Sequence, residues 1–102
     1  MDAVSMLGRT GEELELLRRH IEMLKVTKEN QPIGIIRLSE ILGMPKHKVR
    51  YSLRLLEQEG LIVATSGGAT VSDRYDTFMT DLPRFLDDVV DKVEAIRSGI
   101  LG

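Results

Sequence analysis

The side chains best suited to binding a charged partner are concentrated between Pro45 and Ile62. Those with a cationic group or an imidazole are Lys46, His47, Lys48, Arg50 and Arg54. At about 100° per residue, the apolar Val49, Leu53 and Leu56 share one face of a helix. On or near the opposite face fall His47, Arg50, Tyr51 and Arg54. The pattern predicts a helix whose apolar side docks on a core while its basic, hydrogen-bonding side stays exposed.

A basic helix face is often no more than solvated surface. Here Tyr51 falls on the same exposed face, and a neutral surface role does not explain an aromatic residue there. Guanidinium and ammonium groups form strong charge-assisted hydrogen bonds with phosphate oxygens. We therefore interpret this helix as one that reads a polyanion.

No other group of residues has the spacing of a known catalytic or metal site. The sequence contains no GxxxxGK[ST], GxGxxG or HExxH motif and no cysteine. His20 and His47 fall on different predicted helices, and Asp87, Asp88 and Asp91 are more simply a solvated helix face than a cation site. We expect no enzymatic activity, no metal and no cofactor, and the sequence assigns no small-molecule effector.

The length and composition predict one soluble domain with an aliphatic core. The chain has 102 residues, of which 42% are hydrophobic and only 4% aromatic. Neither a signal peptide nor an apolar run near 18 residues is visible, so we expect a cytoplasmic protein. The segment from Arg37 to Gly60 contains five Lys/Arg and three Asp/Glu, whereas the segment from Asp73 to Arg97 contains four Lys/Arg and seven Asp/Glu. Such a separation of charge suits oriented docking on a polyanion.

The first half of the chain predicts a tail and two helices ahead of the basic one. Residues 1–9 are expected to be a flexible tail. Thr10 and Glu13 match a capping box, so an amphipathic helix of about 15 residues should start there. After Pro32, Ile33 to Ile35 is either a short strand or an extended linker. A short helix from Arg37 to Leu42 should bury Leu38, Ile41 and Leu42, and Gly43 then allows a tight turn into Pro45.

The second half predicts a hairpin and a long helical region. Gly60 should end the basic helix, and Leu61–Thr65 and Ala69–Ser72 should pair around Ser66-Gly67-Gly68. Pro83 predicts a break or kink near Thr80 to Leu82. An apolar stripe from Tyr75 to Ile100 is longer than one small core requires, so we expect a homodimer. Its predicted interface residues are Tyr75, Phe78, Leu82, Phe85, Leu86, Val89, Val93 and Ile96. The simpler reading, in which this helix only packs on Leu14, Leu17, Ile21 and Leu24 of its own domain, stays open.

Two runs, L-S-E-x-L-G from Leu38 and K-V-R-x-x-L-R-x-L-E-x-E-G-L-I from Lys48, resemble winged helix-turn-helix transcriptional regulators. The likeness is strongest to small MarR-like and ArsR-like predicted regulators of archaeal type, and it covers about Leu14 to Ser72. It implies an α+β, mostly α fold with a winged helix-turn-helix domain (residues 10–73) and a short β-hairpin wing. Beyond the likeness, the apolar stripe predicts a long C-terminal helical region (residues 74–102) that serves dimerisation.

The resemblance implies that the helix from Pro45 to Glu59 enters the major groove of double-stranded DNA, which is about 12 Å wide and admits one helix. The implied DNA-binding residues are Ser39, Lys46, His47, Lys48, Arg50, Tyr51 and Arg54. Arg50 is the candidate for a bidentate contact to guanine, Lys46 and Lys48 for phosphates, and Tyr51 for a thymine methyl or a phosphate. Ser39 would approach the backbone.

The hairpin departs from the family pattern because it contains no Lys or Arg. In winged-helix proteins the wing commonly sends a basic side chain to DNA. Here only Thr65, Ser66, Thr70 and the nearby Arg74 could serve. We expect a sequence-specific DNA-binding regulator of transcription. The alternative is a winged-helix protein–protein interaction module of transcription or replication machinery, favoured by the net charge of −2.

Overall fold

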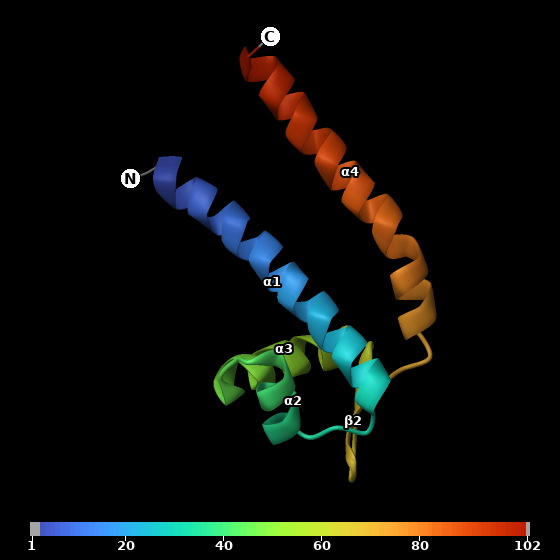
Figure 1. The fold of residues 1–102 in the computed structure, drawn as a ribbon. Helices are drawn as coiled ribbons and strands as arrows, with labels where there is room; N and C mark the ends of the chain where they lie inside the picture. The colour runs from blue at the N-terminus through green and yellow to red at the C-terminus, as the bar shows by residue number, and fades with distance from the viewer. Residues whose placement is uncertain (1–2, 102) are drawn as a thin grey trace.

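The structure, a computed structural model, describes residues 3–101 and places them in four helices and one hairpin. The order is α1 (Ala3–Asn30), α2 (Ile35–Leu42), α3 (Lys46–Gln58), β1 (Ile62–Thr65), β2 (Gly68–Val71) and α4 (Tyr75–Leu101). Figure 1 shows α2, α3 and the hairpin gathered around the C-terminal end of α1, with α4 returning toward the N-terminus. This arrangement is the predicted winged helix-turn-helix fold with a long C-terminal helix.

The core lies where α1, α2, α3 and the hairpin meet, and it is almost wholly aliphatic. Its buried apolar residues are Met23, Leu24, Ile33, Leu38, Val49, Leu56, Leu61, Ile62 and Ala69. Helices α1, α2 and α3 and the hairpin all contribute to this set. The buried face of α3 therefore packs against the rest of the domain, and this packing fixes the orientation of the helix. The aliphatic core expected from the composition is confirmed.

Glycines with positive φ join the elements on either side of α3. Gly43 has φ 63° at the C-cap of α2, and its N–H bonds to the carbonyl of Ser39. Gly60 has φ 76°, and the following Leu61 N–H bonds to Leu56 O at 2.9 Å. Both conformations are strained for residues with a Cβ, so Gly43 ends α2 and Gly60 follows the end of α3, as predicted.

The hairpin is anchored to the segment between α1 and α2. Ile33 and Ala69 exchange two backbone hydrogen bonds, at 3.0 and 2.8 Å. A Cβ at Gly68 would lie 2.6 Å from the Ile33 carbonyl carbon, so only glycine allows this approach. The Gln31 side chain accepts a further bond from Val71 N–H at 2.9 Å. The sequence left open a short strand or an extended linker for Ile33–Ile35. The structure has a one-residue bridge at Ile33, and α2 begins at Ile35 after Gly34.

Helix α1 begins before its predicted start. The structure has helix from Ala3, so Thr10 is an interior residue whose hydroxyl donates to Met6 O at 3.3 Å, and the capping-box prediction is wrong. An interior hydroxyl can bond the carbonyl one turn back, so the motif alone does not mark a start. Of the tail predicted over residues 1–9, Met1 and Asp2 lie outside the described residues.

Two details of α2 and α4 also differ from the predictions. Ile41 is 45% exposed instead of buried. Helix α4 is continuous through Pro83, so of the two predicted alternatives, a break or a kink, the break is wrong. A proline removes one backbone bond and bends a helix, and the apolar face continues on both sides of it. Figure 1 shows α4 changing direction in its orange, N-terminal part.

Helices α1 and α4 both extend well beyond the core. The radius of gyration is 16.2 Å, against about 13 Å for a compact domain of this length. The two helices contact each other only sparsely within the described residues. None of the described helices combines the length and apolar character needed to cross a membrane.

Candidate nucleic-acid interface

Helix α3 buries one face and exposes a basic one. Val49, Ser52 and Leu56 are buried and hold the helix against the core. The exposed residues are Lys46, His47, Lys48, Arg50, Tyr51 and Arg54. Tyr51 is 46% exposed. The structure therefore brings six of the seven predicted DNA-binding residues together on one surface.

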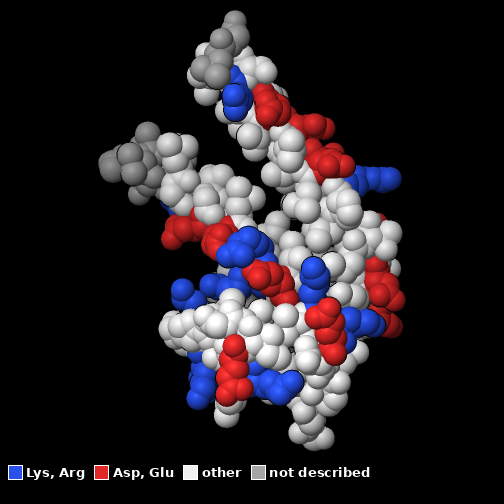
Figure 2. Space-filling view, in the orientation of Figure 1, with Lys and Arg blue, Asp and Glu red and all other residues white. Residues whose placement is uncertain are grey.

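The cations of this surface are not neutralised within the domain. No Lys or Arg of α3 has a carboxylate partner within salt-bridge distance among the described residues. In the view of Figure 2, basic side chains gather on the lower body of the molecule, whereas acidic ones predominate along α4. Because the apolar face of α3 is buried, its cations point outward. Their positive charge is therefore accessible to a polyanion.

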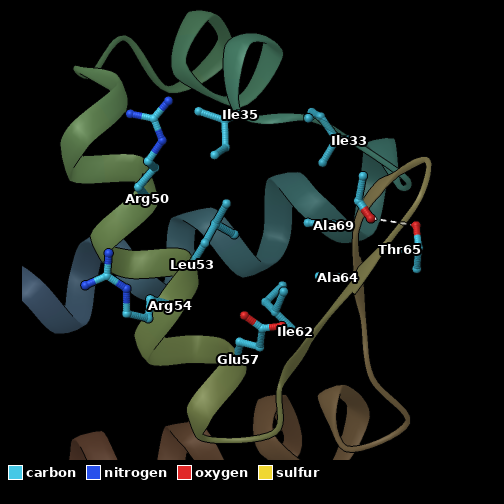
Figure 3. Close-up of a pocket in the computed structure, with 12 residues that line it drawn as sticks. Ile33, Ile35, Arg50, Leu53, Arg54, Glu57, Ile62, Ala64, Thr65 and Ala69 are labelled. Carbon is cyan, nitrogen blue, oxygen red and sulfur yellow. Dashed lines mark hydrogen bonds between the residues drawn. The ribbon is translucent and has the colours of Figure 1, made fainter.

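A groove of about 420 Å³ runs between α3, the start of α2 and the hairpin. Figure 3 shows Arg50 reaching toward the α2 side and Arg54, one turn later, extending away from the hairpin. Leu53, Ile62 and Ala64 line the groove floor. The two arginines therefore project from one helix in different directions, which suits contacts to different parts of a duplex.

Ser39, the seventh predicted residue, serves the turn between the two helices. Its hydroxyl donates to the carbonyl of Met44 at 2.5 Å, and its own carbonyl accepts the Met44 N–H at 3.2 Å. These bonds hold the α2–α3 turn closed. The donor of the hydroxyl is already used, so Ser39 orients α3 directly and is poorly placed to donate to a phosphate.

The hydroxyls of the wing are largely committed to the hairpin itself. The Thr65 hydroxyl donates to Gly68 O at 2.7 Å, as the dashed line in Figure 3 shows, and accepts from Gly67 N–H. The Thr70 hydroxyl donates to Val63 O at 3.3 Å. Ser66 is exposed at the tip. Of the three predicted wing hydroxyls, that of Ser66 is the one without a hydrogen bond among the described residues.

Arg74 lies away from the wing tip. Its guanidinium is 3.5 Å from Glu59 O, beside Gly60 at the C-terminus of α3. A cation there interacts favourably with the negative end of the helix dipole. The Ser72 hydroxyl accepts from Arg74 N–H at 3.1 Å and donates to Gly60 O at 2.6 Å. Arg74 and Ser72 therefore tie the end of α3 to the start of α4.

The apolar stripe of α4 divides into two parts. Tyr75 and Phe78 are half-buried against the core of their own domain, and Lys28 Nζ lies 5.4 Å from the Tyr75 ring centroid. Leu82 and Val89 are half-buried. Phe85, Leu86, Val93 and Ile96 are exposed, at 50%, 38%, 51% and 63%. Apart from Val89, the described apolar side chains beyond Leu82 are thus exposed.

Sequence reasoning missed contributions from α1. Met6, Leu7 and Leu14 of α1 are 60%, 70% and 46% exposed, so α1 also carries exposed apolar surface. Arg19 lies beside the exposed basic face of α3, and its Nε donates to the buried Ser52 Oγ at 3.0 Å. The one signal for this contact was a serine on the apolar face of α3, which needs a partner when buried.

No family model matches the chain. The chain is similar to the HTH-type transcriptional regulator NmtR of Mycobacterium tuberculosis, with 27% identity over 78 residues. The match covers 76% of this chain and 63% of that relative. The narrower likeness to MarR-like and ArsR-like proteins stays a prediction. Together with the fold, the similarity supports a transcriptional regulator of helix-turn-helix type.

Proposed function

We propose that this protein is a homodimeric regulator of transcription that binds double-stranded DNA through α3. The observation that carries the proposal is the exposed basic face of α3, whose cations have no carboxylate partner among the described residues. N-terminal side chains of a recognition helix reach base edges while neighbouring cations hold phosphates. In this scheme Arg50, Arg54, His47 and Tyr51 read bases, and Lys46 and Lys48 hold the backbone.

The proposal divides the chain into a DNA-binding unit over residues 10–73 and a dimerisation helix over residues 74–102. Its support is the uncovered apolar surface. The accessible surface is 7264 Å², whereas a folded monomer of 11.5 kDa typically exposes about 5,800 Å². The excess of about 1,500 Å² is larger than the ~800 Å² that each partner buries in a standard interface.

The dimer is the occupant that best fits this surface. The exposed side chains of α4 beyond Leu82 offer apolar surface that a second copy can cover with its own, and Met6, Leu7 and Leu14 of α1 are exposed as well. A two-fold dimer presents two α3 helices to half-sites about 34 Å apart, one helical turn of DNA. Two copies then compensate for a wing that offers little charge.

The chain spans 63% of the length of NmtR, so what that protein does as a whole does not carry over directly. The match covers 76% of this chain, and this similarity supports DNA-binding regulation as the function.

Selection of bound fragments from sheared genomic DNA, followed by sequencing, tests the proposal. We expect enrichment of an inverted repeat whose half-sites are centred about 10.5 base pairs apart, or a multiple of that spacing. Enrichment of a single unrepeated site would contradict the dimer, and no enrichment at low salt would contradict DNA binding. In that last case the protein–protein module becomes the better account.

A further inference from the structure

Arg19 is a cation beside the recognition helix that belongs to a different element, α1. Its Nε donates to Ser52 Oγ at 3.0 Å, joining residues 33 positions apart. Ser52 is fully buried and Arg19 is partly buried. The adjacent Arg18 contrasts with it, because Arg18 is exposed and pairs with Glu15 and Glu22 of its own helix. Two neighbouring arginines thus have different surroundings.

The guanidinium of Arg19 lines an open hollow of about 450 Å³ on the flank of α3. The other lining residues are His47, Lys48, Tyr51 and Arg54. The hollow therefore carries three permanent cations, an imidazole and a phenol, and no carboxylate among its lining residues. Phosphate oxygens are the acceptors that such a set of donors recognises.

The bond to Ser52 prepares Arg19 for such a contact. A guanidinium has five N–H donors, and the bond to Ser52 uses the one on Nε. The two Nη groups keep theirs, and no described protein acceptor takes them. Because Ser52 already fixes the plane of the group, less rotational freedom is lost when an anion binds.

We propose that Arg19 is a further DNA-binding residue, which together with Lys48 holds a backbone phosphate beside the major groove, and that Ser52 is its positioning residue. The proposal rests on the proposed function and adds a phosphate contact from α1. Helix α1 also carries part of the proposed dimer surface. The distance between this phosphate contact and the partner subunit is therefore set by one continuous helix.

The test is a salt titration of binding to a mixed-sequence duplex of about 30 base pairs, three helical turns, followed by fluorescence anisotropy. Each lost phosphate contact reduces the slope of log K against log salt by about 0.9, so Arg19→Ala should reduce it by about 1.8 in a dimer. Arg19→Lys should keep the wild-type slope. Arg18→Ala is the matched control, and it should leave slope and affinity unchanged.

Ser52→Ala separates positioning from charge. The cation stays, so the salt slope should be that of wild type, while the affinity should fall several-fold because Arg19 is no longer held in place. Thermal unfolding of each variant checks that the domain is folded. A wild-type slope for folded Arg19→Ala would overturn the phosphate contact, and wild-type affinity for Ser52→Ala would overturn the positioning role. If wild-type protein shows no salt-dependent binding at all, it is the proposed function that fails.

Discussion

Helices α3 and α4 are both amphipathic, but they expose opposite faces. The 13-residue α3 buries Val49, Ser52 and Leu56 and exposes its cations. The 27-residue α4 exposes much of its apolar face beyond Leu82, and its charged residues are mainly acidic. Exposed charge is normal for a soluble protein, whereas a contiguous exposed apolar strip marks an interaction surface.

The difference separates two kinds of recognition in one small chain. Electrostatic contacts through α3 suit a polyanion and weaken with salt. Apolar contacts through α4 suit a second protein surface and respond little to salt. The acidic side chains of α4 also disfavour binding of DNA along that helix, which leaves α3 as the favoured surface for the duplex.

The largest effect should come from charging the exposed face of α4. Val93→Glu plus Ile96→Glu would place carboxylates in the proposed dimer interface, where their desolvation is costly. Sedimentation equilibrium should then give a mass near 11.5 kDa, and DNA affinity should fall by about 10²–10⁴ because the half-sites are no longer bound together. Asp88→Glu plus Asp91→Glu, on the acidic side of the same helix, is the control.

An unchanged mass in the doubly substituted protein would show that α4 beyond Leu82 does not form the dimer. A monomeric wild-type protein at tens of micromolar would show the same more directly. In either case the paired arrangement of two recognition helices would have to be abandoned, although DNA binding by one α3 would remain possible.

One substitution made in both helices sharpens the comparison. Val49 is fully buried in α3 and Val93 is 51% exposed in α4. Val49→Ala should reduce the free energy of unfolding by about 2 kcal/mol, from lost burial and a small cavity. Val93→Ala should change the unfolding of the monomer by less than about 0.5 kcal/mol but weaken the dimer about tenfold or more.

Chemical denaturation at low protein concentration and sedimentation at a series of concentrations measure the two quantities separately. Equal destabilisation of folding by both substitutions would mean that α4 packs on its own domain in solution, as the simpler reading of its stripe proposed.

A smaller effect should come from pH. Burial lowers the pKa of His20 below its ordinary value of 6.5, and the positive charge of Arg19 lowers it further, against an opposing effect of Glu13. The unfolded chain therefore binds a proton more readily than the folded one, so stability is full above about pH 6.5 and falls as the pH drops below it. The side chain lies between α1 and α3, so acid should loosen their packing.

Thermal unfolding at about pH 7.5 and about pH 5.5 checks this, since the interval spans the ordinary histidine pKa. His20→Gln should show a smaller loss of stability on acidification than wild type. His47→Gln, at an exposed position of α3, should behave like wild type. An unchanged loss in His20→Gln would assign the pH dependence to other groups.

The sequence predicted the arrangement of α2, α3 and the hairpin well because the signals for these elements are local. The apolar spacing of Val49 and Leu56, with Gly43 and Gly60 at the turns, contains the information that orders α2, α3 and the hairpin. The basic face followed from the same spacing. The hydrogen bond from the Ser39 hydroxyl to the Met44 carbonyl could not be predicted, because only the closed turn brings the two groups together.

The ends of the long helices were predicted less well because tertiary context decides them. Thr10 and Glu13 match a start signal, yet helix continues through them to Ala3. Helix α4 continues through Pro83. The Arg19–Ser52 bond joins residues far apart in the chain, and no spacing rule places the two together before the helices are packed.

The central claim is that the basic face of α3 reads DNA, and a salt-resolved anisotropy titration of Arg50→Ala plus Arg54→Ala tests it most directly. The DNA would be a genomic fragment selected by wild-type protein. Each good bidentate contact to a base is worth about 1–3 kcal/mol, so loss of both arginines in both subunits should reduce specific affinity by about 10³-fold or more. The salt slope should also become shallower, and the sedimentation mass should stay that of the dimer. Wild-type affinity and slope in this variant would contradict the account.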